Sequence, residues 1–542
     1  MKTKKIIILL AAALVAVPAL AACSVSNQGQ PSAGEFPLPE PDYNAKLPRD
    51  FTPFEEAMST LTDERRGELD AALATVTIPD IQKLFDDGSL TSEELTIYYL
   101  DRIKRYDVDN FNSVLALNPK ALEEAKAMDA ERASGQSRGM MHGIPILLKD
   151  NIAIKGMNTA AGAYAMKDWT PDRDATVTAA LRTSGAVILG KANLSEWANW
   201  MDAGMPNGFS ALGGQTRNPY GPFETYGSSS GSAVAAAANF AVVTVGSETQ
   251  GSLLMPAYIN SAVGLKPTHS LVSGDYIIPL MPFQDNAGPM GRSVTDVAVL
   301  LTAMVSPDPN DADAMAKAGE DYTSYFTTEA LSGLRLGMTG KNDELQATLE
   351  KLGIQVVLID SKDVPGAAPA SEILPPVFKY AIDDFLPAVN APVKSLEEVI
   401  AANKEDMQNR APYGQGYLEE SQNTKLSKEE TDKQVEERIK TYNDALTTLF
   451  DQYNVDVIMV NDIGVAAPLG QTYAPAGWPA MTIPAGYGEN GEPVSISFAA
   501  RPYEEGKMLA TAFVIEQIAK AYRPPNLEAT IQMLDEKLGD KK

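Results

Sequence analysis

The chain of 542 residues has very few of the side chains that hold metal ions or form disulfide bonds, with one Cys and two His. A single Cys excludes an intrachain disulfide, a cysteine-based zinc cluster and an iron–sulfur site. Two His exclude a three-histidine metal site. We therefore expect the chemistry of this protein to use no metal and no cofactor.

Basic residues are also scarce, because 45 Lys and Arg stand against 71 Asp and Glu and give a formal net charge of −26. An acidic surface of this kind repels phosphate backbones, so we expect no nucleic-acid partner. The chain is 44% hydrophobic and 21% charged, which is typical of a globular protein and excludes a largely disordered one.

The N-terminus carries the features of an export signal. MKTKK precedes an apolar run of about 15 residues, which is shorter than the ~20 of a membrane-spanning helix and is interrupted by Pro18. Leu20-Ala21-Ala22-Cys23 follows and resembles the bacterial lipobox. That resemblance implies cleavage after residue 22 and a lipid on Cys23. The alternative is an ordinary signal peptide in which Cys23 has no role.

These features predict how the chain begins and where it resides. Residues 1–22 would be a lipoprotein signal peptide, and residues 23–52, rich in Ser, Gln, Gly and Pro, would be an extended tether to the lipid anchor. We expect an exported protein that is held on the bacterial cell envelope by the lipid at Cys23. The sequence does not predict an oligomeric state.

The rest of the chain alternates between helical and strand-like stretches, as in residues 143–150, 173–190 and 233–249. This pattern predicts an α/β fold, with one large domain and a mixed, mostly parallel central sheet covered by helices on both faces. The domain would span residues 53–530.

Within that domain we expect a core at residues 141–305, followed by a more polar, variable region at 305–450 that forms a lid or contacts substrate. A long charged helix is predicted near 428–452. Residues 531–542 would be a frayed tail.

One candidate for catalysis is Lys149, which ends the apolar stretch GIPILLKD. Burial lowers the pKa of a lysine because its charged form loses hydration, and a neutral lysine can act as a base. Taken alone, a Lys at the end of a strand is more often one that reaches solvent or forms an ion pair.

Two serine-containing segments add to this candidate. GSSSGS (227–232) leads into an Ala-rich helix and presents backbone N–H groups and hydroxyls, but it lacks the lysine of a phosphate-binding loop. GSETQGSLLMPA (246–257) runs from a strand into a small-residue turn at Ser252. Such a turn suits a serine nucleophile with an oxyanion hole.

Together these segments resemble the amidase signature family, whose members hydrolyse carboxylic amides with a Ser-Ser-Lys triad. GIPILLKDNI, GSSSGS and GSETQGSLLMPA match the family's three motifs, and Ser252 follows Ser228 by 24 residues, the family's usual gap. Further matches include GKANLSEWA (190–198), VGLKPT (263–268) and AGWPAMTIPAGY (476–487). The resemblance covers roughly residues 75–525.

The resemblance implies a role for each matching residue. Lys149 would be the base, Ser228 the bridging serine and Ser252 the nucleophile that forms an acyl-enzyme. The family builds its oxyanion hole from backbone N–H groups that correspond here to Thr249, Gln250, Gly251 and Ser252. In the family the bridging serine also follows a cis peptide bond, which would be Gly227–Ser228 here. A histidine triad that uses His142 or His269 is the rival mechanism.

Two departures from the family pattern concern the substrate. Many members pair an acid with an Arg near the nucleophile, whereas here Glu248 is present and Leu254 stands where the Arg often lies. The serine motifs are closer to the peptide-amidase branch, which removes C-terminal amide groups from peptides. We therefore expect a peptide amide or another small amide as substrate.

Two other functions remain open at this point. One is the glutaminase subunit of a tRNA-dependent amidotransferase, which shares the fold and the triad. The other is a non-catalytic lipoprotein that binds a ligand or a surface.

Overall fold

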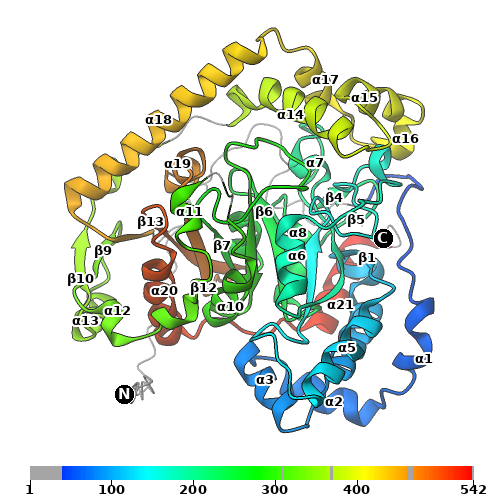
Figure 1. Ribbon diagram of the computed structural model, residues 1–542, viewed down its shortest axis with the longest axis horizontal. Coiled ribbons are helices and arrows are strands. Elements are labelled where there is room, and N and C mark those ends of the chain that lie inside the picture. Colours follow the sequence, from blue (N-terminus) through cyan, green and yellow to red (C-terminus); the bar gives the residue numbers. More distant parts are fainter. Residues whose placement is uncertain (1–38, 308, 310, 367–369, 461–467, 540–542) are drawn as a thin grey trace.

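The computed structural model describes residues 39–539 except 308, 310, 367–369 and 461–467 (Figure 1). The predicted signal peptide, Cys23 and the first part of the predicted tether lie outside the described residues. Within the described ranges, no helix has the length and apolar character needed to cross a membrane.

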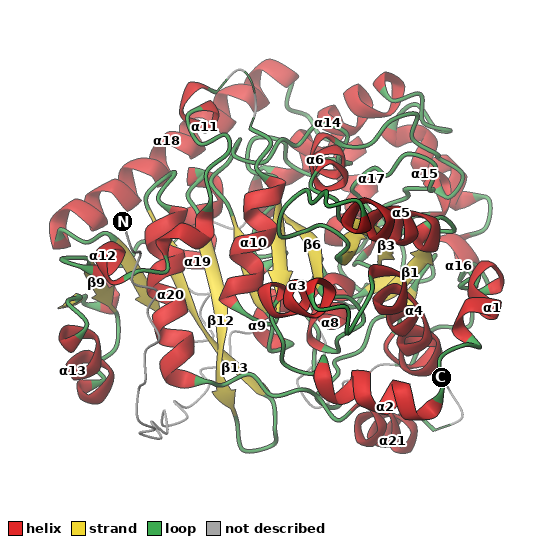
Figure 2. Cartoon of the chain, turned by 60° about the horizontal axis from the view of Figure 1, so that its bottom comes forward, coloured by secondary structure: helices red, strands yellow, loops and turns green. Residues whose placement is uncertain are grey.

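One mixed sheet of 11 strands forms the centre of the domain, and Figure 2 shows its strands running between helices. Its order is β1-β3-β2-β6-β8-β7-β12-β13-β11-β9-β10. The strands are β1 (Val114–Leu117), β2 (Pro145–Lys149), β3 (Val187–Ala192), β6 (Val243–Glu248), β7 (Val263–Lys266), β8 (Asn286–Gly291), β9 (Arg335–Met338), β10 (Gln355–Leu358), β11 (Val457–Val460), β12 (Ala480–Tyr487) and β13 (Pro493–Ala500). A separate pair consists of β4 (Phe209–Ser210) and β5 (Gly214–Gln215).

The pairing confirms the predicted α/β fold with a mixed sheet. Parallel pairing links β3, β2 and β6 on one side and β11, β9 and β10 on the other. The strands between these two groups, and the edge strand β1, pair antiparallel.

The helices fall into three groups. The N-terminal layer contains α1 (Glu55–Met58), α2 (Asp63–Ala72), α3 (Ile78–Asp86), α4 (Ser92–Arg102) and α5 (Ala121–Ala133). Around the core strands lie α6 (Thr176–Thr183), α7 (Glu196–Asn199), α8 (Ser230–Ala237), α9 (Leu254–Ile259), α10 (Val294–Met304), α20 (Glu505–Ala519) and α21 (Leu527–Leu538). The remainder are α11 (Ala312–Met315), α12 (Thr328–Leu331), α13 (Asp343–Lys351), α14 (Leu374–Ala388), α15 (Leu396–Lys404), α16 (Met407–Arg410), α17 (Gly416–Gln422), α18 (Lys428–Tyr453) and α19 (Pro468–Ala476).

The expected lid region, residues 305–450, is only partly a cover. Its residues supply β9 and β10 at one end of the central sheet, so part of it belongs to the core architecture. The predicted long helix is present as α18, which crosses one side of the domain beside the cluster α14–α17 (Figure 1).

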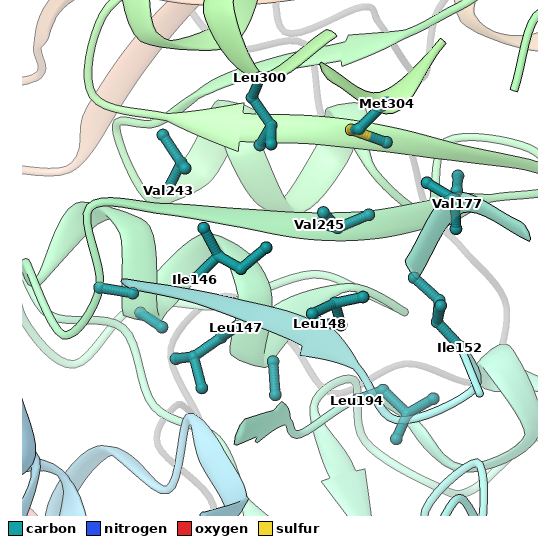
Figure 3. Close-up of a cluster of buried hydrophobic side chains, with 14 of the residues drawn as sticks. Ile146, Leu147, Leu148, Ile152, Val177, Leu194, Val243, Val245, Leu300 and Met304 are labelled. Atoms are coloured by element: carbon teal, nitrogen blue, oxygen red, sulfur yellow. The ribbon is translucent and has the colours of Figure 1, made fainter. Parts of the chain in front are cut away.

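Strand β2 carries Lys149 and is held by apolar contacts on both faces. Figure 3 shows Ile146, Leu147 and Leu148 of β2 among side chains of β6 and α10, such as Val245 and Leu300. All five are fully buried. A strand enclosed on both faces needs a continuous apolar run rather than an alternating one, and each such side chain contributes about 1.5–3 kcal/mol when buried. The end of this strand is therefore a rigid place for a functional group.

Residues 39–52 do not form the free tether that we expected. The side chain of Arg49 is buried, and its guanidinium donates hydrogen bonds to the carbonyls of Val114 (2.7 Å) and Gly213 (3.1 Å). Glu40 forms an ion pair with the buried Arg217 at 3.3 Å. Residues 39–52 therefore form a strap on the domain. Arg49 and Glu40 bind buried partners that lie far away in the sequence, and the amino-acid composition of the segment does not reveal these contacts.

The C-terminal boundary also differs from the prediction of a frayed tail at 531–542. Residues 531–538 continue α21, in which Leu534 and Leu538 are buried. The hydroxyl of Thr530 in the same helix donates to the carbonyl of Pro219 at 2.9 Å. The domain therefore extends to the end of α21.

Replacing Arg49 by Ala tests the strap. The change leaves the carbonyls of Val114 and Gly213 without these donors, so we expect the free energy of unfolding to fall by about 2–4 kcal/mol. Urea unfolding measures it. Lys46→Ala is the control, because its ion pair with the exposed Asp109 (3.3 Å) is solvent-screened and its pair with Glu40 is long (3.9 Å), so each is worth at most ~1 kcal/mol. A loss for Arg49→Ala as small as that expected for Lys46→Ala would contradict the strap.

Candidate active site

Lys149 and Ser228 meet in the interior of the domain. Both side chains are fully buried, and the Lys149 Nζ lies 2.7 Å from the Ser228 Oγ. The same Nζ donates a hydrogen bond to the carbonyl of Ser247 at 3.1 Å. Loss of hydration on burial lowers the pKa of Lys149 to about 7, although the nearby charges of Asp285 and Glu248 act in the opposite direction. The amine is therefore uncharged in a large fraction of molecules near neutral pH.

The serine loop before α8 is fastened to the end of β6. The Ser229 hydroxyl donates to the carbonyl of Ser247 at 2.8 Å and accepts the Ser247 N–H at 3.1 Å. The Ser228 carbonyl accepts the Ser195 N–H at 3.0 Å. The peptide bond Gly227–Ser228 is cis, as the family resemblance implied.

Ser252 lies in the turn between β6 and α9, next to this loop. Its carbonyl accepts the Ser229 N–H at 2.8 Å, which joins the two serine segments through their backbones. Gly251 has a φ of +78°, a left-handed conformation that favours glycine. Ser252 is 7% exposed, so it is the member of the predicted triad that solvent reaches. In the described part of the chain no hydrogen bond joins the Ser228 and Ser252 hydroxyls.

The predicted oxyanion residues Thr249, Gln250 and Gly251 form the first part of this turn. The Thr249 hydroxyl donates to Asp285 at 2.6 Å, and its carbonyl accepts the side-chain amide of Gln284 at 2.9 Å. The loop before β8 therefore holds the start of the turn from outside the predicted motif.

Glu248 binds the residues that follow the nucleophile. Its carboxylate accepts the N–H groups of Leu253 and Leu254, each at 3.0 Å, and the hydroxyl of Tyr473. Lys266 lies in the same region, and burial lowers its pKa to about 8 against the opposing charge of Glu248. Leu254 stands where many members of the family have an Arg. The Glu248 carboxylate is accompanied here by two backbone N–H groups, the phenol of Tyr473 and the nearby Lys266.

Our sequence reasoning missed Lys266, Tyr473 and Asp285. Lys266 lies within the flanking match VGLKPT, which was a usable signal, since a lysine at the end of an apolar strand repeats the pattern of Lys149. Tyr473 and Asp285 lie in segments with no comparable local pattern.

The two histidines have partners outside the serine site. The buried His142 ring contacts the carbonyl of Met128 through Nε2 at 2.9 Å. In His269, Nε2 contacts the Pro282 carbonyl at 3.0 Å and Nδ1 the Ser270 hydroxyl at 3.2 Å. These contacts offer no support for the rival histidine triad. Over the described residues there is also no group of three or more His, Cys, Asp or Glu that could hold a metal ion.

Comparison with known proteins agrees with this geometry. The family model described as Amidase matches residues 94–509. A probable amidase of Arabidopsis thaliana is 35% identical over 482 residues, covering 84% of this chain and 93% of the relative. A Glutamyl-tRNA(Gln) amidotransferase component of Moorella thermoacetica is 29% identical over 493 residues, covering 83% of this chain and 97% of that relative.

Solved structures are similar over most of the chain. An amidase family protein from Bacillus anthracis str. Ames has a TM-score of 0.80 and 35% identity, covering 90% of this chain and 100% of that protein. The native peptide amidase from Stenotrophomonas maltophilia has a TM-score of 0.77 and 36% identity, covering 84% and 99%.

The pKa of Lys149 predicts a pH profile. Because the neutral amine is the form that accepts a proton, we expect kcat/KM to rise with pH up to about pH 7, its folded-state pKa, and to level off above it. Lys149→Met should lower kcat/KM by about 10²–10⁴ at pH 8. Steady-state rates from pH 5 to 9, with chemistry rate-limiting, measure both effects.

His269→Ala is the control for that experiment, and it should keep both the activity and the profile. A flat profile in the wild-type protein, or loss of the rise in His269→Ala, would contradict Lys149 as the base.

Proposed function

The chain belongs to the amidase family and is an amide-hydrolysing enzyme, and we propose that it cleaves the amide C–N bond through an acyl-enzyme on Ser252. The observation that carries this proposal is the desolvated Lys149 amine, 2.7 Å from the Ser228 hydroxyl. Its hydrogen-bond partners among the described residues are the Ser228 hydroxyl and the Ser247 carbonyl, both uncharged, and a buried lysine without an ion pair has few structural uses that would offset the cost of its burial.

The proposed reaction begins with proton transfer along the two hydroxyls. Neutral Lys149 accepts the proton of Ser228 while Ser228 accepts that of Ser252, whose oxygen attacks the amide carbon. The substrate oxygen becomes negative and is stabilised by backbone N–H groups of the turn at residues 249–252. The C–N bond then breaks, and the proton returns through Ser228 to the departing nitrogen, which leaves as ammonia or an amine.

The second half of the reaction hydrolyses the ester on Ser252. A water molecule attacks the acyl carbon and gives its proton to the same relay, and the acid leaves as Ser252 regains its hydrogen. The Ser228 and Ser252 hydroxyls must come within hydrogen-bond distance during this cycle. The backbone bond between Ser229 and Ser252 (2.8 Å) keeps the two segments adjacent and so supports such an approach.

We propose the C-terminal amide of a peptide as the substrate, with other small amides as weaker ones. The 36% identity to the Stenotrophomonas maltophilia peptide amidase over 84% of this chain supports this choice, as do the two serine motifs. A solved structure of a peptide amidase in complex with the competitive inhibitor chymostatin is likewise 36% identical over 84% of this chain. Ammonia release from a panel of peptide amides, aryl amides and glutamine tests the substrate, and glutamine as the best of the panel would contradict it.

The two alternative functions have less support. The amidotransferase role rests on the Moorella thermoacetica relative, but a chain with a net charge of −26 is poorly suited to work close to tRNA, and its N-terminus has the pattern of an export signal. A non-catalytic binding protein would have no use for Lys149, Ser228 and Ser252 together.

Covalent labelling separates an enzyme from a binding protein. A serine-directed fluorophosphonate should label the purified protein once per chain, and Ser252→Ala should abolish the label, because Ser252 is the member of the triad that solvent reaches. Mass spectrometry measures it. Ser230→Ala, at the first residue of α8 and two positions after Ser228, is the matched control and should keep the label. Undiminished labelling of Ser252→Ala would exclude Ser252 as the nucleophile.

We also propose that the enzyme is exported and anchored to the cell envelope by a lipid on Cys23. The support is the lipobox-like Leu20-Ala21-Ala22-Cys23 and the fact that Cys23 is the only cysteine of the chain.

Metabolic labelling with an alkyne fatty acid tests the anchor. The wild-type protein should carry the label and sediment with membranes, whereas Cys23→Ser should lose both properties, since no other thiol is present. Ser24→Ala should behave as wild type. A Cys23→Ser protein that keeps the label would rule out this anchor.

A further inference from the structure

Thr249, the first residue of the predicted oxyanion turn, is held at both of its polar groups by two consecutive residues. Its hydroxyl donates to Asp285 Oδ1 at 2.6 Å, and its carbonyl accepts the Gln284 side-chain amide at 2.9 Å. In a trans peptide the carbonyl oxygen and the following N–H point in opposite directions. Fixing the Thr249 carbonyl therefore also fixes the direction of the Gln250 N–H.

Asp285 is itself firmly positioned. Its second oxygen accepts the backbone N–H groups of Leu280 (2.8 Å) and Met281 (2.9 Å). Burial raises the pKa of Asp285, while these N–H groups and the Thr249 hydroxyl lower it. All three partners donate, so they favour the ionised carboxylate over the protonated acid.

The same carboxylate is a principal charge acting on Lys149. Asp285 and Glu248 both favour the protonated amine, and the effect of Asp285 is the larger. Two further charged groups near the end of β2, Asp150 and Lys191, lie 3.5 Å apart and pair with each other. Glu248 is occupied by Tyr473 and by the backbone that follows Ser252.

We propose that Asp285 is a positioning residue that orients the oxyanion turn through Thr249. Its charge has a second effect, because it favours the protonated amine of Lys149. The inference rests on the proposed function. One carboxylate thus holds the turn that receives the developing negative charge and also acts electrostatically on the amine that takes the proton.

Asp285→Asn separates the two effects in a single pH–rate profile. Without the carboxylate the protonated form of Lys149 is less favoured, so the rise in kcat/KM should move to lower pH by about half a unit or more. The plateau should fall about tenfold or more, because Thr249 loses a charged hydrogen-bond partner. Should this variant not fold, Asp285→Ala removes the same charge and gives the same readout.

Thr249→Val and Thr249→Ser isolate the first effect. Thr249→Val removes the hydroxyl but keeps the carboxylate, so the plateau should fall while the rise stays at the wild-type pH. Thr249→Ser restores the hydroxyl and should restore most of the plateau.

Glu505→Gln is the matched control for burial and hydrogen bonding. Glu505 is a buried carboxylate that accepts the hydroxyl (2.5 Å) and the N–H (2.7 Å) of Thr268, but it has no part in the charge environment of Lys149. Its loss should lower the melting temperature without moving the profile.

Two results would overturn the inference. One is a plateau of Asp285→Asn equal to that of the wild-type protein, and the other is an equal fall of the plateau in Glu505→Gln. Failure of the proposed function looks different, because Lys149→Met would then stay active or Ser252→Ala would still be labelled, whatever Asp285→Asn does.

Discussion

The site depends on the removal of one amine from water. Lys149 is fully buried at the end of a strand whose apolar side chains are enclosed on both faces, and this burial lowers its pKa to about 7. An amine left in solvent would be protonated at neutral pH and could not accept a hydrogen from a serine. The packing around β2 is therefore part of the chemistry, because any opening that hydrates Lys149 also removes the base.

The surrounding polar groups hold the site together without neutralising the lysine by a direct ion pair. The carbonyl of Ser247 accepts from both Lys149 and the Ser229 hydroxyl, so the end of β6 joins the base to the serine loop. Asp285 and Glu248 add negative charge in the neighbourhood, but each is engaged by other donors. The pKa of Lys149 thus stays close to neutral pH, where the amine can gain or lose a proton.

Similarity to amidases defines the reaction class, while the finer assignment depends on local differences. Leu254 removes a possible positive charge beside the nucleophile, and Tyr473 from α19 contacts Glu248 instead. This contact ties the nucleophile turn to a segment distant in the sequence. Helix α19 in turn packs against α18, which crosses one side of the domain, so the nucleophile turn is linked to this long helix (Figure 1).

Local sequence patterns were enough to predict the α/β class, the strand that ends at Lys149, the loop before α8 and the turn at Gly251, because apolar runs and glycine-rich turns act over a few residues. Long-range packing was needed to establish that residues 39–52 form a strap and that residues 531–538 are helical. It also brought Asp285 to Thr249 across 36 residues and Tyr473 to Glu248 across 225. Such contacts depend on how the sheet is ordered, and no local pattern of side chains encodes that order.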